Sequence, residues 1–363
     1  MNSIFVHGIY TKNVGDDLFL KILLERYPST KMVMLAPDEY KHLLGGYANC
    51  VVVSESDKTI SSLVRICKFI HAPKNLLVYI YLFIKYRITL FLIIGGSLFI
   101  EGNSNTPSLL NGLKKMRFLF PKLKIAILGS NFGPTKTKKW CGKVAEALAV
   151  CEDVCFRDKA SYELFSALPM VRWGNDIVMH AEAIKKYEVN KSICVNIRSV
   201  DSWPTLKPYK EAYLSNTLKI VNYFIEKGYS VQLLSFCERY GDEVITDELY
   251  NLIENKDNVH KHYYRGNIDE IIEVISSSEF MVGTRFHAII IGLVYGLRVL
   301  PISYSVKTEN ALKSIGRWND KYIFQEFCKA EINDLVKCFI DHFSVDKSLN
   351  TQFTYLDNKL TIR

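Results

Sequence analysis

The order of apolar runs along the chain is the feature that most restricts its fold. Short apolar runs, such as residues 3–7 and 89–94, alternate with segments whose apolar residues recur at helical spacing, such as residues 138–149. A second series starts near residue 190 with "SICVNIR" and continues through "SVQLLSF", "EFMVG" and "RVLPIS". Strands that alternate with helices indicate a parallel sheet covered on both faces. The sequence therefore predicts an α/β chain with two such sheets.

The domain boundaries follow from a loosening of this pattern at residues 171–190. We predict an N-terminal Rossmann-like domain over residues 1–180, a C-terminal one over residues 190–335, and a partly helical tail over residues 336–363. Two such domains with parallel sheets facing across a cleft are the arrangement of the GT-B fold. Ligands bind open parallel sheets beyond the carboxyl ends of the strands, where helix N-termini supply donors. The candidate loops are residues 13–17, 95–102, 129–134, 198–203 and 283–287.

The net charge indicates which kind of ligand the chain binds, and the cysteine spacing indicates whether it binds zinc. The formal charge of +8 favours an anionic ligand, but no basic run interleaved with aromatic residues indicates a nucleic-acid module, so we expect no nucleic-acid partner. Cys151 and Cys155 have no His or second cysteine pair nearby to complete a zinc site. We expect reduced thiols, no metal and no cofactor. The N-terminal residues do not resemble a signal peptide, which predicts a cytoplasmic protein.

The apolar stretch from Leu76 to Ile94 has the length of a membrane span, but Lys85 and Arg87 fall near its middle, where hydrocarbon disfavours charge. We therefore reject a span. Two interpretations stay open: a buried helix that runs into a buried strand, or an apolar and basic surface that holds the protein at the inner face of the cytoplasmic membrane, as a peripheral protein.

Three cationic residues interrupt the apolar stretch "VGTRFHAIIIGLVYGLRVLPISYSVKTEN". Arg285 and His287 follow a strand and a tight turn at Gly283-Thr284, and they open a helix so apolar that it must be buried. The helix dipole there attracts anions, and a guanidinium binds phosphate or carboxylate with two hydrogen bonds. Lys307 follows the next strand and could reach the same pocket. The alternatives are local capping for the first pair and a solvated loop lysine for Lys307.

Six segments occur in the order found in the polysaccharide pyruvyl transferase family, which this chain resembles over about residues 1–320. The resemblance rests on "KNVGDDLFLKIL", "IIGGSLFIEG", "ILGSNFGP", "FRDKASYELF", "GNDIV" and the Gly-Thr-Arg-x-His block with its downstream Lys. It implies an enzyme that transfers the enolpyruvyl group of phosphoenolpyruvate to a sugar of a polysaccharide or lipid-linked precursor. There the group closes as a pyruvate ketal and phosphate leaves.

This chemistry assigns roles to the cationic residues. Phosphoenolpyruvate carries a carboxylate and a phosphate, so its site needs several cations, and Arg285, Arg198 and Lys307 could supply them. Protonation of the methylene carbon needs a general acid, and His287 is our candidate because an unperturbed imidazole titrates near neutrality, at a pKa of about 6.5. Arg285 would act beside it as a catalytic cation. Gly283 and Thr284 would bind substrate through the turn.

The acceptor side is assigned to the N-terminal domain. Asp16 and Asp17 open a helix, so one of them could be its N-cap and the other a base, or a partner of sugar hydroxyls, across the cleft from His287. The family's Gly-Asp matches Gly15-Asp16, which favours Asp16. The remaining candidates are Arg157, which could bind substrate or pair with Asp158, the turn glycines Gly95 and Gly96, and Glu101 for the acceptor sugar.

Two other functions compete with pyruvyl transfer. The first is a GT-B glycosyltransferase that uses a nucleotide sugar. Many such enzymes place an acidic residue in the helix of the second domain, whereas residues 286–297 contain none. The second is a non-catalytic sugar-binding subunit of a polysaccharide assembly complex, which has no need for Arg285, His287 and Lys307 to converge.

Overall fold

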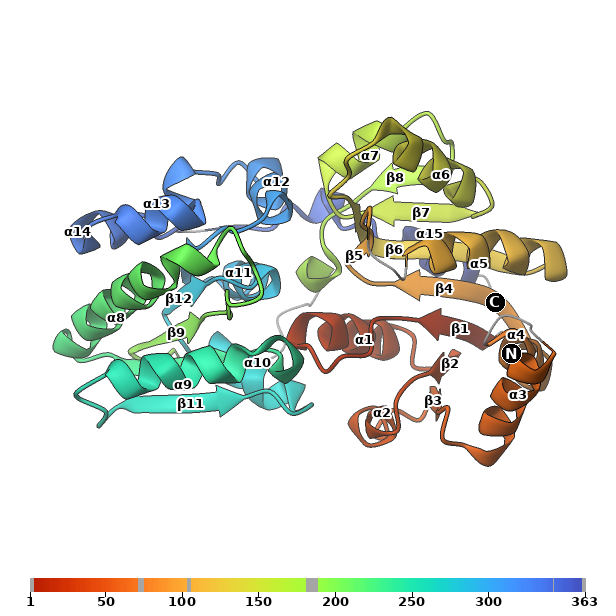
Figure 1. Cartoon of the computed structure of the whole chain (residues 1–363), viewed down its shortest axis with the longest axis horizontal. Coiled ribbons are helices and arrows are strands. Elements are labelled where there is room, and N and C mark those ends of the chain that lie inside the picture. The colour runs from red at the N-terminus through yellow and green to blue at the C-terminus, as the bar shows by residue number, and fades with distance from the viewer. Residues whose placement is uncertain (1–2, 71–74, 103–105, 181–188, 342, 361–363) are drawn as a thin grey trace. The chain divides into compact units, whose positions relative to one another are not determined.

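The computed structural model describes residues 3–70, 75–102, 106–180, 189–341 and 343–360, which form two compact units (Figure 1). Unit 1 comprises Met1–Tyr10, Phe19–Ile177 and Ser348–Arg363, and unit 2 comprises Thr11–Leu18 and Val178–Lys347. Both units are therefore discontinuous in sequence. A short segment near the N-terminus belongs to unit 2, and the C-terminal segment belongs to unit 1.

Unit 1 is built on a parallel sheet whose strand order is β3-β2-β1-β4-β6-β7-β8, with β5 paired to β6. Figure 1 shows these strands from β3 to β8. The central strands are buried along nearly their whole length, as expected where helices cover both faces of a sheet. The strands are β1 (Ser3–His7), β2 (Lys31–Leu35), β3 (Cys50–Val53), β4 (Ile88–Ile94), β5 (Ser97–Phe99), β6 (Lys124–Phe132), β7 (Asp153–Phe156) and β8 (Val171–Trp173).

Helices separate the strands of unit 1 along the chain, and their apolar faces close its core. Trp140 and Val144 of one helix, for example, belong to the same buried cluster as Ile127 of β6. The helices are α1 (Val14–Arg26), whose first turn is part of unit 2, α2 (Glu39–Leu43), α3 (Lys58–Phe69), α4 (Leu76–Tyr86), α5 (Thr106–Leu119), α6 (Lys138–Leu148), α7 (Lys159–Phe165) and α15 (Thr354–Leu360).

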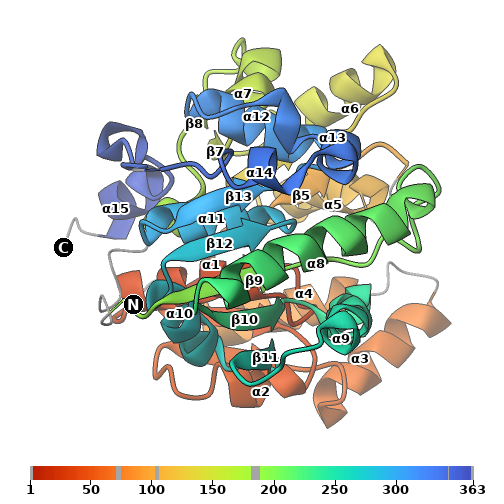
Figure 2. The same ribbon diagram turned by 90° about the vertical axis from the view of Figure 1, so that its left-hand side faces the viewer.

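Unit 2 contains a five-stranded parallel sheet in the order β11-β10-β9-β12-β13, which Figure 2 shows side by side. The strands are β9 (Ser192–Asn196), β10 (Ser230–Ser235), β11 (Val259–Tyr263), β12 (Phe280–Gly283) and β13 (Arg298–Pro301). The helices are α8 (Lys210–Glu226), α9 (Asp242–Leu252), α10 (Ile268–Ser276), α11 (Phe286–Val294), α12 (Val306–Ser314), α13 (Phe324–Lys329) and α14 (Ile332–Leu335). Every residue of α11 from Phe286 to Leu293 is buried, and the helix packs against β12 and β13.

The apolar stretch that has the length of a membrane span is a helix followed by a strand. Its first half is α4 and its second half is β4, and Arg87 between them takes the left-handed conformation that ends the helix. In the part of the chain that the structure describes, no helix combines the length and the apolar character that crossing a bilayer requires. The prediction of a buried helix running into a buried strand is confirmed for β4, whereas α4 is only partly buried.

The predicted tail over residues 336–363 is divided between the two units. Residues 336–347 belong to unit 2, and Ser348–Arg363, with the short helix α15, belongs to unit 1. Its Gln352 is fully buried, and the side-chain oxygen accepts a hydrogen bond of 2.9 Å from the backbone N–H of Gly129, where the pairing of β6 with β7 shifts register. Asp357 accepts two hydrogen bonds from the guanidinium of Arg26 and one from Tyr27. The part of the tail from Ser348 onward therefore contributes to the packing of unit 1.

Candidate functional site

The cationic candidates of unit 2 follow three neighbouring strands of its sheet. Arg198 comes two residues after β9, Arg285 two residues after β12, and Lys307 follows β13 as the second residue of α12. Because β9, β12 and β13 are adjacent and parallel, their carboxyl ends meet at one edge of the sheet. The structure therefore brings these three residues to the same edge, as the sequence predicts.

Arg285 is the residue that precedes α11 and is only 8% exposed. The carboxylate of Asp242, which begins α9 and is fully buried, accepts hydrogen bonds from Nε, at 2.9 Å, and from Nη2. Burial alone would lower the pKa of Arg285, but the charge and hydrogen bonds of Asp242 outweigh it and raise the pKa. Among the described residues, Nη1 makes no hydrogen bond, so this end of the guanidinium can donate to an anion.

The turn between β12 and α11 is fixed by buried hydrogen bonds. Asn196, at the end of β9, accepts the backbone N–H of Arg285 through its side chain and the N–H of Thr284 through its carbonyl. The Thr284 hydroxyl lies 2.7 Å from that of Tyr213. A Cβ on Gly283 would lie 3.0 Å from a side-chain carbon of Ile289, so the strand end packs closely on α11. Gly283 and Thr284 thus shape the turn.

Aromatic rings hold the other two cations. The guanidinium of Arg198 lies 4.9 Å from the ring of Trp203 and 4.4 Å from the ring of Tyr304, both measured to the ring centroid. Tyr304 therefore lies directly against Arg198. The ammonium of Lys307 lies 5.0 Å from the ring of Phe286. A cation held against an aromatic face has a defined direction.

His287 lies in the first turn of α11, is 9% exposed, and is in contact with the start of α1. A Cβ added to Gly15 would overlap the imidazole ring, so only glycine fits at this position. The segment Thr11–Leu18 is fixed further by the N–H of Val14, which donates to the carbonyl of Phe236 at 3.3 Å. The imidazole and the Gly15-Asp16 pair therefore lie side by side within unit 2.

The two aspartates of α1 have different environments. Asp17 is 1% exposed and accepts a hydrogen bond of 2.8 Å from the hydroxyl of Tyr264, whereas Asp16 is only half-buried. The predicted capping role falls to neither of them. Asn13 precedes the helix and accepts the N–H of Gly15 through its side chain. Asp17 therefore anchors the segment, and Asp16 is the aspartate that a ligand can reach.

Arg157 is buried in unit 1 and paired, but with a different partner from the one considered above. Its Nη1 donates to Asp176 at 2.9 Å and its Nη2 to Asn131 at 2.7 Å. Asp158 instead caps α7 by accepting the N–H of Ser161. A Cβ on Gly96 would lie 2.8 Å from Nη2 of Arg157. Of the two alternatives for Arg157, the pair with Asp158 does not form, because Asp158 caps α7, and substrate binding by Arg157 stays a prediction.

The turn glycines and Glu101 lie near the ends of β4 and β6 in unit 1. The carbonyl of Gly95 accepts a hydrogen bond of 3.0 Å from the hydroxyl of Ser130. The carboxylate of Glu101 accepts from the hydroxyls of Thr135 and Thr137 and from the backbone N–H groups of Lys136 and Thr137. These bonds, above all the one from Thr137, lower the pKa of Glu101 to about 2. Glu101 therefore holds the loop before α6, and its ligand role stays a prediction.

The cysteines are all free thiols, and Cys151 and Cys155 are buried. Burial raises the pKa of Cys155 to about 12, so this thiol stays protonated at neutral pH. Within the described ranges, no three His, Cys, Asp or Glu side chains are grouped so that they could hold a metal ion.

Asp242, Tyr264 and Tyr304 are site residues that the sequence did not single out. Asp242 and Tyr264 follow β10 and β11, so extending the strand-edge rule to every strand of unit 2 would have found them. Asp242 contacts Arg285 and Tyr264 contacts Asp17, and these tertiary contacts cannot be predicted from a local sequence pattern.

We expect a large decrease in the free energy of unfolding when the ion pair between Asp242 and Arg285 is broken. Asp242→Asn removes the charge that offsets a buried guanidinium, and breaking a buried pair typically costs about 3–5 kcal/mol. Asp247→Asn is the matched control on the same helix, because Asp247 pairs with Lys261 at the surface, where a pair is worth about 1 kcal/mol or less. Urea unfolding of both variants measures the difference, and equal losses would contradict this role of Asp242.

The comparisons with known proteins agree with this geometry. The profile of the family described as polysaccharide pyruvyl transferase matches residues 13–306. The amylovoran biosynthesis protein AmsJ of Erwinia amylovora is 25% identical over 158 residues, 40% of this chain and 34% of AmsJ, so the match spans about a third of that relative's length.

Similar solved structures include the UDP-GlcNAc 2-epimerase of Neisseria meningitidis bound to UDP-GlcNAc, at a TM-score of 0.61 and 10% identity over all of both chains. The putative UDP-N-acetylglucosamine 2-epimerase of Listeria monocytogenes has a TM-score of 0.59 at 10% identity, over 100% of this chain and 97% of the other. At this identity the likeness concerns the fold alone, and it confirms the predicted GT-B-like α/β class.

Proposed function

We propose, from the premise that this chain belongs to the polysaccharide pyruvyl transferase family, that it transfers the enolpyruvyl group of phosphoenolpyruvate to a sugar of a polysaccharide or of a lipid-linked precursor. The product is a pyruvate ketal, and phosphate is released. The family membership and the match to an amylovoran biosynthesis protein support a pyruvyltransferase role in polysaccharide synthesis. The donor and the ketal are part of the proposal.

The observation that carries the proposal is the arrangement around His287. The imidazole lies against Gly15 at the start of α1. His287 is the second residue of α11, which Arg285 precedes and Phe286 begins. Arg198 lies against Tyr304, and Lys307 lies against Phe286. A carboxylate and a phosphate on adjacent carbons need cations from separate directions, and three strand ends of unit 2 supply them.

The proposed reaction gives each group one task. The imidazolium of His287 donates its proton to the methylene carbon of phosphoenolpyruvate, which makes C2 electrophilic. A sugar hydroxyl attacks C2 and loses its proton, for which Asp16 is our candidate base. The C2–O bond to phosphate then breaks, and the phosphate leaves with the proton that Asp16 took. A second hydroxyl of the sugar attacks C2 to close the ketal, and its proton goes to the imidazole of His287, which restores the acid. Arg198, Arg285 and Lys307 would bind the carboxylate and the departing phosphate.

A nucleotide-sugar glycosyltransferase or epimerase is the second candidate, because structures with this fold include a UDP-GlcNAc 2-epimerase bound to UDP-GlcNAc. A carboxylate in the helix after β12 would be expected to bind ribose hydroxyls in many glycosyltransferases of this fold. Residues 286–297 contain no Asp or Glu, which counts against this candidate.

The test is incubation of the purified protein with phosphoenolpyruvate and a panel of soluble and lipid-linked oligosaccharides, with a chelator present. We expect one acceptor to gain the mass of a pyruvate ketal while one phosphate is released for each product, at the same rate with and without the chelator. Release of phosphate without a mass gain, or a strict requirement for a divalent metal, would contradict the mechanism.

A further inference from the structure

The positive charge of the chain is concentrated in residues 58–145. This range holds fifteen Lys and Arg residues and a single acidic residue, Glu101, so its formal charge is +14, whereas the whole chain carries +8. The rest of the chain is therefore net acidic. An asymmetry of this size indicates that one part of the surface meets an anionic partner.

The most exposed aromatic side chains of the described structure lie in the same range. Phe69, the last residue of α3, is 84% exposed, and Phe118, near the end of α5, is 83% exposed. Single exposed apolar side chains are common, but a group of them marks an interaction surface. We call this group the basic apolar face, and its apolar members are Ile66, Phe69, Ile70, Ile84, Phe118 and Leu119.

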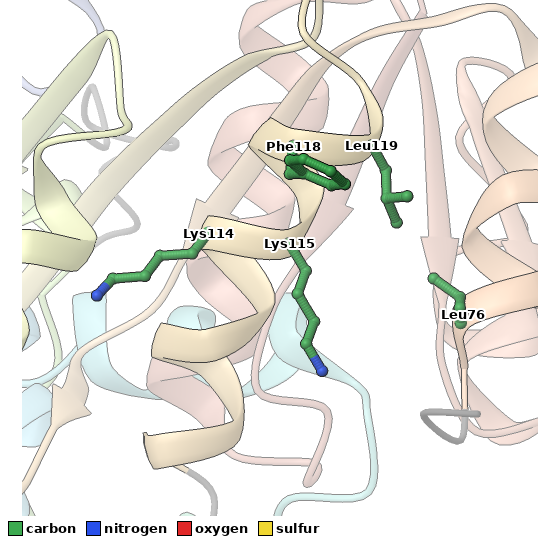
Figure 3. A pocket seen from close by; sticks show the side chains of 5 residues that line it. All are labelled: Leu76, Lys114, Lys115, Phe118 and Leu119. Carbon is green, nitrogen blue, oxygen red and sulfur yellow. The ribbon is translucent and has the colours of Figure 1, made fainter. Parts of the chain in front are cut away.

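These side chains come from helices that pack together in unit 1. The N–H of Leu77, at the start of α4, lies 3.4 Å from the sulfur of Cys67, near the end of α3. A pocket of about 420 Å³ lies between α4 and α5, lined by Leu76, Lys114, Lys115, Phe118 and Leu119 (Figure 3). Figure 3 shows Lys115 on the side of Leu76 and Lys114 on the opposite side of α5. Helix α4 therefore contacts α3 near Cys67, and Leu76 at its start lies beside the end of α5.

The charges on this face are mostly basic, and some of them are paired. Arg117 pairs with Glu152 at 3.0 Å. Lys114 pairs with Glu146 at 2.7 Å, at the surface. In the part of the chain that the structure describes, no carboxylate pairs with Lys68, Lys85 or Lys115. Lys85 lies instead over the rings of Tyr81 and Tyr86, at 5.2 Å from each centroid. Exposed aromatic and aliphatic side chains beside unpaired lysines are the composition of surfaces that lie in a membrane interface.

We propose that the basic apolar face docks on the surface of a lipid bilayer that contains anionic headgroups. Phe69 and Phe118 enter the boundary between headgroups and acyl chains, and the lysines bind the headgroup phosphates. The exposed aliphatic side chains of Ile66, Ile70 and Ile84 distinguish this occupant from a nucleic acid, which stacks its bases on aromatic rings. The proposal does not rest on pyruvyl transfer, because the face is formed by α3, α4 and α5 and uses no residue of the site in unit 2.

Sedimentation of the full chain with vesicles tests the proposal. We expect binding to vesicles of phosphatidylcholine mixed with phosphatidylglycerol, and little binding to phosphatidylcholine alone. Phe69→Ser combined with Phe118→Ser, and separately Lys68→Glu combined with Lys115→Glu, should each weaken binding at least about tenfold, because each Lys near an anionic surface and each buried apolar group contributes measurably.

Matched controls separate this surface from general effects. Leu164→Ser removes another exposed apolar side chain of unit 1, and Lys321→Glu with Lys347→Glu makes the same change of net charge in unit 2. These variants should bind vesicles as the unmodified chain does. Absence of binding, equal binding to both kinds of vesicle, or binding unchanged in the face variants would overturn the proposal. So would a dimer in solution that the Phe69→Ser and Phe118→Ser changes dissociate. Turnover of a soluble acceptor, measured in parallel, should be unchanged.

Discussion

Replacement of His287 by Gln should reduce the rate of pyruvyl transfer by about 10²- to 10⁴-fold, the usual contribution of a general acid. Glutamine keeps much of the volume and a hydrogen-bond donor but cannot give up a proton. The ring lies against Gly15, and the cations of the site come from other residues, so binding of phosphoenolpyruvate should stay within a few-fold of the unmodified value. The measurements are steady-state kinetics and equilibrium binding on the same preparation.

His260→Gln is the matched control for this change. His260 lies on β11 and is exposed, so its replacement should leave both turnover and binding unchanged. Retained turnover in the His287 variant would remove this residue from the mechanism. A parallel loss of binding and turnover would instead make it a binding residue.

Gly15→Ala should also reduce turnover, by about 10²-fold, although it adds one methyl group and touches no charge. The added Cβ would overlap the imidazole of His287, so the ring has to move, and a displacement of about 1 Å of a catalytic group costs a factor of this size. Alanine stabilises a helix by about 1 kcal/mol relative to glycine, so lost helix stability would not explain a loss of activity in this variant.

Gly142→Ala provides the comparison, because Gly142 lies in helix α6 and a Cβ there meets open space. We expect full turnover and equal or higher stability for this variant. Full turnover in the Gly15 variant as well would show that His287 does not depend on its contact with α1. Thermal unfolding of both proteins shows whether a change in turnover reflects lost structure.

Much of the fold could be predicted because its central strands are continuous apolar runs. The strands β4, β6, β9 and β12 are buried along almost their whole length, and such runs can be found without tertiary information. β11 was missed because it is an edge strand with exposed His and Lys side chains, and β8 because it has only three residues. Apolar periodicity is weak in both.

The sequence predicted the positions of the site residues that directly follow strands. It did not predict the partners of these residues. The strand-edge rule placed Arg198, Arg285 and Lys307 correctly at one edge of the sheet in unit 2. It could not show that Asp242 holds Arg285, or that Arg157 pairs with Asp176 rather than with its neighbour Asp158. These partners are distant in sequence, and only the folded chain decides between them.

The role of the segment at residues 11–18 shows the same limit. From the sequence, Asp16 and Asp17 are an acidic first turn and a candidate cap. The structure assigns the segment to unit 2, with Gly15 against His287 and Asp17 hydrogen-bonded to Tyr264. Gly15 has to be a glycine because His287, more than two hundred residues away in sequence, lies against it, and no local sequence pattern shows this requirement.

Calorimetric titration of the full chain with phosphoenolpyruvate tests the central claim most directly, which is that the cations of unit 2 form the donor site. We predict one molecule bound per chain, no competition from UDP-GlcNAc, and affinity at least about tenfold weaker in Arg198→Ala, since a guanidinium paired with an anion contributes about 1.5–3 kcal/mol. Binding of UDP-GlcNAc with no heat from phosphoenolpyruvate would contradict the account and favour the nucleotide-sugar alternative.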